Sequence, residues 1–164
     1  MRLLILGAGQ HGHVVKEIAE ATGIYEKIDF LDDASLEAVG RLEEYVGFSQ
    51  TYEAAFPAFG NAKLRKDWME KLREAGYELP AVIHPTAVIS PSAVIGQAVV
   101  VGQLVVVNTH SVIADGAILS AGVKIDHDCE VGICCHIDCG VTVASNAKVA
   151  DLVKIEVGEV VKRA

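Results

Sequence analysis

The segment Ile125-Asp126-His127-Asp128-Cys129 contains the residues best suited to acid–base chemistry in this chain. An imidazole such as that of His127 has a pKa of about 6.5 and can accept a proton near neutral pH. A neighbouring carboxylate can orient the ring and stabilise its protonated form, and Asp126 and Asp128 both adjoin it in the sequence. His127 is therefore a candidate general base, and the alternative is a surface histidine at a turn.

A glycine-rich segment near the N-terminus has the spacing of a phosphate-binding loop. Residues 7–12 read GAGQHG, which fits the pattern G-x-G-x-x-G after an apolar run. Glycines there let backbone amides and a helix N-terminus approach a diphosphate, and a carboxylate about twenty residues on, here Asp32 or Asp33, can bind a ribose or a base. The favoured ligand is a nucleotide-sugar diphosphate. A nicotinamide or flavin cofactor and a purely structural turn are the alternatives.

All four cysteines lie between residues 129 and 139. Together with His136 they could form a zinc site, but their spacing is not that of paired C-x2-C ligands, so no metal site is predicted. We expect Cys129 and Cys135 to be small core residues in a reducing compartment, and Cys134 and Cys139 to be partly exposed.

The elements that must position His127 follow from a repeat, because an aliphatic residue recurs at every sixth position from Ile83 to Val161. An α-helix repeats every 3.6 residues and a strand every 2, whereas a period of six is typical of a β-helix. A small or modest-sized residue follows four positions after each aliphatic, with Glu159 as the exception, and glycine, asparagine or aspartate often follows directly, where we expect tight turns. Three such sides predict a triangular coil of 18 residues, with one inward aliphatic per side.

Residues 1–80 lack this repeat and instead alternate between predicted strands and helices. Their order predicts a small Rossmann-like parallel sheet, and Pro80 and Pro85 mark where the repeats start. We therefore expect an α/β domain over residues 1–80 and an all-β domain over residues 81–164. The expected strands cover residues 3–6 and 28–31 and a segment near 57–59, and the expected helices cover 13–22 and 63–75, with Gly76 closing the second helix.

Composition limits the possible partners. The chain has 164 residues, of which 51% are hydrophobic and 22% charged, as expected of a soluble protein with a core. A formal net charge of −8 argues against a general nucleic-acid or anionic-membrane surface, because both attract a positive field. The N-terminus reads as a strand followed by glycines and not as a signal peptide, so we expect a cytoplasmic protein.

Several motifs together support one family resemblance. They are GAGQHG at 7–12, FLDD at 30–33, FGN at 59–61 with Arg65, AVIHPTA at 81–87, IDHDC at 125–129 and His136-Ile137. With these motifs the chain resembles the bacterial sugar O- and N-acetyltransferases of the sialic acid O-acetyltransferase (NeuD) and bacillosamine N-acetyltransferase (PglD) type. The resemblance covers nearly the whole chain, and I-x-H-D-C within six-residue repeats is its most specific element.

This resemblance implies a left-handed β-helix that forms a homotrimer, with acetyl-CoA between adjacent prisms and a nucleotide sugar held by residues 1–80. It also implies that His127 is the general base and that Asp128 orients it, with no metal. The implied substrate-binding residues are Gly9, His11, Gly12, Asp32 and Asp33. The implied cofactor-binding residues are His136, near the acetyl group, and the pair Ser145 and Asn146, where the family usually has two glycines.

The C-terminal repeats differ from the family pattern. Relatives typically continue with further coils that help to bind the coenzyme, whereas this chain ends at Ala164, so we expect coenzyme binding to be weakened or lost. We also expect the charged residues of the final repeats to cap the open end of the prism. These residues are Glu156, Glu159, Lys162 and Arg163.

The leading hypothesis is a homotrimeric enzyme that transfers acetyl from acetyl-CoA to an amino group of a nucleotide-linked deoxysugar by direct attack. The near alternative is acetylation of a sialic-acid-type hydroxyl. A shortened, non-catalytic trimer that binds a nucleotide sugar is a third possibility. Nicotinamide-dependent oxidoreduction is a fourth, but the sequence has no catalytic set for it.

Overall fold

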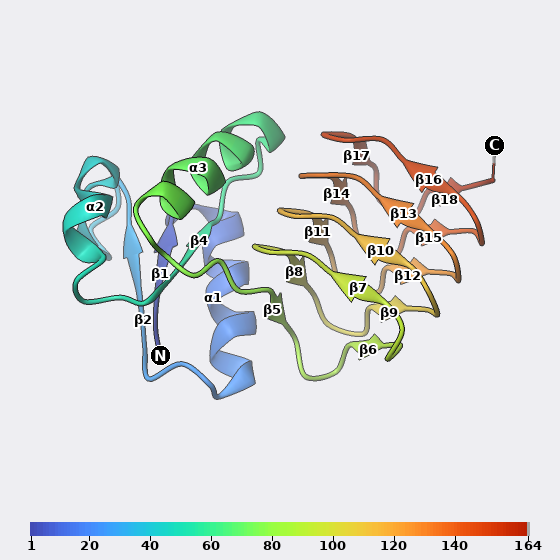
Figure 1. The fold of residues 1–164 in the computed structure, drawn as a ribbon, viewed down its shortest axis with the longest axis horizontal. Coiled ribbons are helices and arrows are strands. Elements are labelled where there is room, and N and C mark those ends of the chain that lie inside the picture. Colours follow the sequence, from blue (N-terminus) through green and yellow to red (C-terminus); the bar gives the residue numbers. More distant parts are fainter. Residues whose placement is uncertain (164) are drawn as a thin grey trace. The chain divides into compact units, whose positions relative to one another are not determined.

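The computed structural model describes residues 1–163. The chain divides into two compact units, Met1–Pro80 and Ala81–Ala164. Figure 1 shows that helices and a small sheet form the first unit, while stacked coils form the second. Within the described residues, no helix is long and apolar enough to cross a membrane.

The first unit is built on a parallel sheet with the strand order β3-β2-β1-β4. Its central strand β1 is apolar on both faces, and Leu3 to Leu6 are fully buried, as expected for the middle of a parallel α/β sheet. The strands are β1 (Arg2–Leu6), β2 (Lys27–Leu31), β3 (Ala38–Gly40) and β4 (Ala54–Pro57). The helices are α1 (Gln10–Thr22), the 3₁₀ turn η1 (Leu42–Glu44), α2 (Tyr45–Phe48) and α3 (Ala62–Glu74).

Several predicted boundaries in this unit were displaced. The third strand, predicted near 57–59, is β4 and ends at Pro57, because the chain must then turn so that the side chain of Asn61 can accept the amide of Leu64 and cap α3. Helix α1 begins at Gln10 and not near residue 13, since the glycine loop itself forms the helix N-terminus. Strand β3 and helix α2 were not predicted, because segments of three or four residues carry little periodicity.

The second unit is a left-handed parallel β-helix, which confirms the predicted fold class. Its two-residue strands pair in parallel with strands 18 residues away, as in the register Val94, Val112, Glu130 and Lys148. Three sheets result, with the orders β16-β13-β10-β7, β17-β14-β11-β8-β5 and β18-β15-β12-β9-β6. The strands are β5 (Val82–Ile83), β6 (Val88–Ile89), β7 (Val94–Ile95), β8 (Val100–Val101), β9 (Val106–Val107), β10 (Val112–Ile113), β11 (Ile118–Leu119), β12 (Lys124–Ile125), β13 (Glu130–Val131), β14 (His136–Ile137), β15 (Thr142–Val143), β16 (Lys148–Val149), β17 (Lys154–Ile155) and β18 (Val160–Val161).

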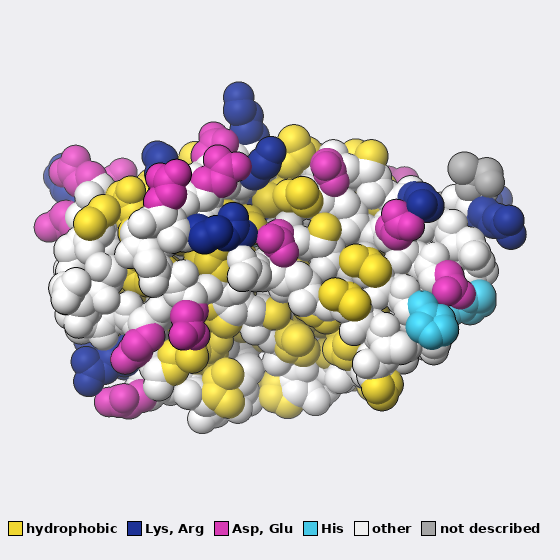
Figure 2. Space-filling model, viewed as in Figure 1, with side chains coloured by type: hydrophobic (Ala, Val, Ile, Leu, Met, Phe, Trp, Pro, Cys, Tyr) yellow, Lys and Arg dark blue, Asp and Glu magenta, His cyan; other side chains and the backbone are white. Residues whose placement is uncertain are grey.

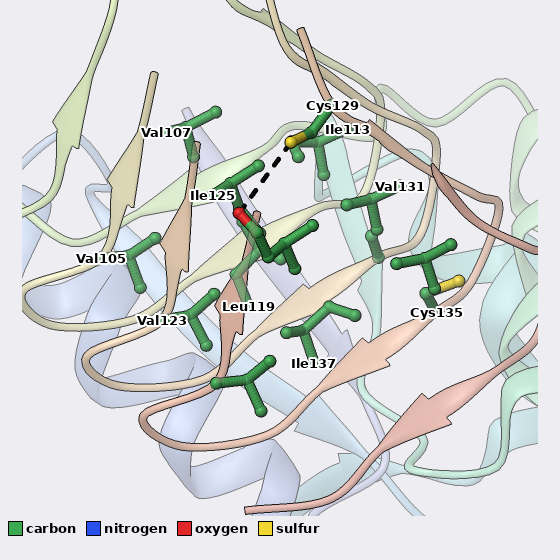
Figure 3. Close-up of a cluster of buried hydrophobic side chains, with 14 of the residues drawn as sticks. Val105, Val107, Ile113, Leu119, Val123, Ile125, Cys129, Val131, Cys135 and Ile137 are labelled. Carbon is green, nitrogen blue, oxygen red and sulfur yellow. Dashed lines mark hydrogen bonds between the residues drawn. The ribbon is translucent and has the colours of Figure 1, made fainter. Parts of the chain in front are cut away.

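Two residues per side, and not the predicted one, fill the interior of the prism. The aliphatic at every sixth position points inward, and so does the smaller residue four positions later, as Leu119 and Val123 illustrate (Figure 3). Cys129 and Cys135 occupy the second kind of position and are fully buried, as predicted. The expectation of partial exposure holds for Cys139 but was wrong for Cys134, which is fully buried.

The corners depend on a left-handed residue in every hexapeptide. From Ala98 to Gly158, each sixth residue has a positive φ, and in most cases it is not glycine. These residues come two positions after the ones predicted to make the tight turns. From Gly116 on, their amides donate to carbonyl oxygens of the preceding coil, as Asp128 N does to the carbonyl oxygen of Thr109 at 2.9 Å. The backbone ladder thus continues around the corners as well as along the sides.

The glycines that directly follow an inward aliphatic serve close packing. A Cβ at Gly132 would lie 2.6 Å from the backbone nitrogen of Asp151 in the next coil and 2.5 Å from its Oδ1. The same Oδ1 accepts the amide of Ile133 at 2.8 Å. A glycine is therefore required here because the next coil approaches closely.

We predict that Gly132→Ala destabilises the protein by about 1–3 kcal/mol, because the added methyl group overlaps backbone atoms that cannot move independently. Urea unfolding followed by circular dichroism measures the change. Gly47→Ala is the matched control, since a Cβ there would meet no atom within 4 Å. Equal stability of the two variants would contradict this explanation.

Candidate active site

His127 and Asp128 form a hydrogen-bonded pair at the corner between β12 and β13. The imidazole Nδ1 lies 2.7 Å from Asp128 Oδ2, and because a carboxylate only accepts, Nδ1 is the nitrogen that carries the proton in this contact. About half of the His127 side chain is exposed, at 51%. Asp128 has φ +55°, a left-handed conformation that aspartate adopts more readily than most residues. The corner therefore presents an oriented imidazole to solvent.

A second histidine meets the same carboxylate. His110, one coil earlier, has its Nδ1 3.4 Å from Asp128 Oδ1. The two carboxylate oxygens thus have different imidazole neighbours, one from each coil. Figure 2 shows histidine side chains gathered around an acidic side chain at one edge of the second unit.

Asp126, the other carboxylate considered as a partner for the ring, has a different role. Its Oδ1 accepts the backbone amide of His127 at 2.8 Å and lies 3.4 Å from Nδ2 of Asn108. It therefore shapes the backbone of the corner, and the carboxylate that contacts the ring is Asp128.

The electrostatics of the pair favour a charged imidazole. The hydrogen bond to Asp128 raises the pKa of His127 above its ordinary 6.5, and the negative charges of Asp126 and Asp128 add to the effect while desolvation opposes it. Reciprocally, the bond from His127 lowers the pKa of Asp128. With Nδ1 directed at Asp128, Nε2 is the atom that can take up a proton from a substrate.

Ser145 and Asn146 lie one coil after His127 and Asp128 at the same corner, as the 18-residue register requires. The amide of Asn146 donates to the carbonyl oxygen of His127 at 3.1 Å, and Asn146 has φ +61°. The structure therefore brings this predicted pair next to the His127 corner.

His136 lies elsewhere on the prism. It belongs to β14, in a different sheet from both β12 and β13, and its Nε2 is 3.3 Å from Ser120 Oγ. Within one chain, His136 and His127 are thus on different parts of the prism and do not form one cluster.

A groove of about 250 Å³ runs along the sheet beside the His127 corner. Strand residues form its floor, and Asp126 and Asn108 lie at the end toward the corner. Its lining residues are Val106, Asn108, Lys124, Ile125, Asp126 and Thr142. The groove offers an extended ligand a partly apolar surface that reaches Asp126, the residue before His127.

The first unit has a pocket of about 420 Å³ beyond the carboxyl ends of β1 and β4. After β1 the chain continues to β2 on one side of β1, whereas β4 lies on its other side. The crevice between the ends of β1 and β4 is therefore a topological switch point, which is where open α/β sheets bind ligands. The lining residues are Gly7, Gly9, Gln10, His11, Asp32, Ala58, Phe59, Gly60, Asn61 and Leu64.

The three glycines of the loop, Gly7, Gly9 and Gly12, differ in why glycine suits their positions. Gly7 has φ +98°, which a side chain would strain, and a Cβ at Gly12 would lie 2.0 Å from the carbonyl oxygen of Gly7. Gly12 therefore packs the helix against the loop and does not line the pocket, although it was predicted to bind substrate. Gly9 has neither constraint, since a Cβ there would meet no atom within 4 Å and would extend into open space at the pocket.

The two carboxylates predicted to bind substrate, Asp32 and Asp33, accept hydrogen bonds from backbone amides. Asp32 lines the pocket, but its Oδ2 accepts the amide of Ala8 at 2.8 Å and its Oδ1 accepts the amides of Ala34 and Ser35. These bonds lower its pKa, the one from Ala8 most strongly. Asp33 accepts the amide of Leu42 at 3.1 Å and is not a lining residue. Asp32 therefore fixes the glycine loop to the end of β2.

The predicted site residues did not include Arg65, which is fully buried behind the pocket. Its Nη1 donates to the carbonyl oxygens of Phe59 and Gly60 at 2.6 and 3.2 Å, so it holds the loop that forms one wall. The available signal was the arginine four residues after FGN. Within residues 1–163, no group of three or more His, Cys, Asp or Glu side chains is arranged to hold a metal ion.

We predict that Asp128→Asn lowers the pKa of His127, because a neutral amide no longer stabilises the imidazolium. A titration of the His127 ring followed by ¹H–¹⁵N NMR measures this. Asp126→Asn is the control, and it should lower the pKa less, since Asp126 acts on the ring through charge alone. A larger shift in the control would contradict the assignment of Asp128 as the partner of the ring.

A family model and several solved structures resemble this chain. The family model for the PglD N-terminal domain matches residues 2–72. The acetyltransferase domain of PglB from Neisseria gonorrhoeae FA1090, solved in complex with acetyl coenzyme A, is 34% identical to this chain, with 99% of this chain and 82% of that chain covered and a TM-score of 0.94. No curated protein matches the sequence.

Two further solved structures are similar. PerB from Caulobacter crescentus, in complex with CoA and GDP-perosamine, is 28% identical, with 99% of this chain and 92% of that chain covered and a TM-score of 0.75. WeeI from Acinetobacter baumannii AYE, at 18% identity and a TM-score of 0.55 over 94% of this chain and 93% of that chain, shares the fold. From its likeness to the PglB domain over almost its entire length, this chain belongs to the NeuD/PglD-type family of sugar O- and N-acetyltransferases.

Proposed function

We propose that this chain transfers the acetyl group of acetyl-CoA to an amino group of a nucleotide-linked amino-deoxysugar. The observation that carries the proposal is the His127–Asp128 pair, with Nδ1 bound at 2.7 Å and Nε2 as the proton acceptor. The relatives support the substrate classes, because the PglB domain was solved with acetyl coenzyme A and PerB with CoA and GDP-perosamine.

The proposed reaction is one direct attack. The sugar nitrogen forms a bond to the thioester carbonyl carbon while Nε2 of His127 accepts a proton from that nitrogen. The resulting imidazolium is stabilised by the carboxylate of Asp128. When the C–S bond breaks, the CoA thiolate leaves and takes the proton from Nε2, which returns the imidazole to its starting state. No acetyl group is attached to the protein at any step.

The pocket of the first unit is the proposed nucleotide-sugar site. The N-terminus of α1 and the loop amides favour an anionic diphosphate, and the open space at Gly9 leaves room for it. His11, in the first turn of α1, lines the pocket and is proposed to contact the diphosphate or the sugar. Asp32 and Gly12 act indirectly by fixing the loop.

Acetyl-CoA is proposed to bind in a homotrimer, between neighbouring prisms. Ser145 and Asn146 adjoin the base at its own corner and are proposed to contact the acyl end of the coenzyme. His136, in another sheet, is proposed to contact it from a neighbouring copy. The proposed location is the cytoplasm, in keeping with the four free thiols, Cys129, Cys134, Cys135 and Cys139.

We predict that His127→Ala lowers kcat by about 10²–10⁴-fold, the usual contribution of a general base. Release of free thiol from acetyl-CoA is measured with UDP- and GDP-linked amino sugars, and with a sialic-acid-type hydroxyl acceptor as a further arm. His84→Ala is the control, because His84 contacts Thr86 in its own turn. Wild-type turnover by His127→Ala would exclude the mechanism, turnover with the hydroxyl acceptor alone would redirect the proposal to O-acetylation, and binding without turnover would exclude catalysis.

We predict that Gly9→Val weakens nucleotide-sugar binding by at least about tenfold without loss of thermal stability, because the side chain fills the pocket and not the core. Calorimetric titration with a GDP- or UDP-linked amino sugar measures the affinity. Gly47→Val serves as control, since it lies in α2 and does not line the pocket. Unchanged affinity in Gly9→Val would place the nucleotide sugar elsewhere.

A further inference from the structure

The corner that precedes the His127 corner is also polar. His110 and Asp128 are separated by one coil and have nearly the same left-handed backbone, with φ values of +59° and +55°. Because equivalent positions of successive coils stack, His110 Nδ1 lies 3.4 Å from Asp128 Oδ1, while Oδ2 is bound by His127. The side chains thus form a chain from His127 through Asp128 to His110.

We propose that His110 is a positioning residue for the base, acting through Asp128. This inference rests on the proposed function, in which His127 is the general base. His110 holds the second oxygen of the carboxylate and so fixes the plane of the carboxylate. Oδ2 then stays directed at Nδ1 of His127, which keeps the proton on Nδ1 and leaves Nε2 as the acceptor.

The exposure of Asp128 explains why a second contact matters. About 47% of its side chain is exposed, so packing alone does not fix the orientation of the carboxylate. A carboxylate bound through one oxygen can rotate about its terminal bond, whose torsional preference is broad. A donor on the other oxygen opposes that rotation.

The same hexapeptide also fixes the backbone of the corner. Ser111 is fully buried, and its Oγ donates to the carbonyl oxygen of Asp126 at 2.6 Å and accepts the amide of Cys129 at 3.0 Å. Among the described residues of the second unit, Ser111 is the one buried polar side chain, and apart from the exposed Glu159 the other positions of its series are alanine, valine or cysteine. Ser111 therefore holds the corner from within the prism, while His110 holds its carboxylate from outside.

Two substitutions at residue 110 separate positioning from folding. Glycine adopts the left-handed conformation without strain, so His110→Gly removes the donor and keeps the corner. Asparagine tolerates the same conformation and places an amide donor at the branch corresponding to Nδ1, so His110→Asn keeps a donor. Leu104→Gly is the matched control, because Leu104 has φ +57° at a different edge of the prism.

We expect His110→Gly to lower kcat by about tenfold with unchanged KM for both substrates, and His110→Asn to restore most of the loss. Leu104→Gly should have wild-type kcat. Wild-type kcat in His110→Gly, or an equal loss in Leu104→Gly, would overturn the proposal.

A second measurement does not depend on turnover. ¹⁵N chemical shifts of the His127 ring report which nitrogen carries the proton, and the wild-type protein above the imidazole pKa should show the Nδ1–H form. His110→Gly should shift the population toward the Nε2–H form that free imidazole side chains prefer, and His110→Asn should not. If the populations of the two forms of the His127 ring are unchanged in His110→Gly, the positioning role is overturned, whether or not any acceptor sugar is turned over. If the populations shift but no sugar is turned over, the result counts against the proposed function alone.

Discussion

The parallel backbone ladder between coils 18 residues apart is the interaction on which the candidate site depends. From Gly116 to Gly158, each corner residue with a positive φ donates its amide to a carbonyl oxygen of the coil before it, so the ladder continues around these corners. The amides of Leu104 and His110 donate instead to the side chains of Thr86 and Ser92 in the coil before them. Consecutive coils therefore stack in strict register, and residues far apart in the sequence acquire fixed neighbours. His110, Asp128 and Asn146 stack at one corner on three successive coils for this reason. A side chain at such a corner is oriented by the whole stack and not by a local loop.

In the first unit, individual hydrogen bonds and close contacts fix the loops around the pocket, and no repeating ladder is involved. The turn from β1 into α1 is fixed by the carboxylate of Asp32, which binds the amide of Ala8, and by the contact of Gly12 with the carbonyl oxygen of Gly7. On the opposite wall, the buried guanidinium of Arg65 holds the carbonyl groups of the loop after β4. Polar groups that a ligand could otherwise contact are thus partly occupied by bonds within the protein, and Gly9 and Gly60 are glycines that leave space open toward the pocket.

The sequence predicted the β-helix well, because a six-residue period is sustained over the whole second unit and no other regular structure produces it. The sequence did not predict the backbone conformation at the corners of the β-helix. The left-handed corner residues are as different as Leu104, Cys134 and Asp128, so their identity does not reveal their conformation, which the ladder imposes. In the first unit, strand β3 and helix α2 were missed because they are too short to show a pattern. The sequence could not distinguish Asp126 from Asp128 as the partner of the imidazole, since both adjoin it in the chain, and their contacts in the folded structure do.

The left-handed backbone of Asp128 has an evolutionary consequence. A side chain in this conformation generally costs about 1–2 kcal/mol, and aspartate less than most, and glycine would remove that cost. Selection for folding stability alone would therefore favour glycine at this corner, although the ladder holds leucine and cysteine in the same conformation at other corners. In a homologous chain with glycine at this position, the prism would be more stable to unfolding, and the imidazole would have lost its carboxylate partner.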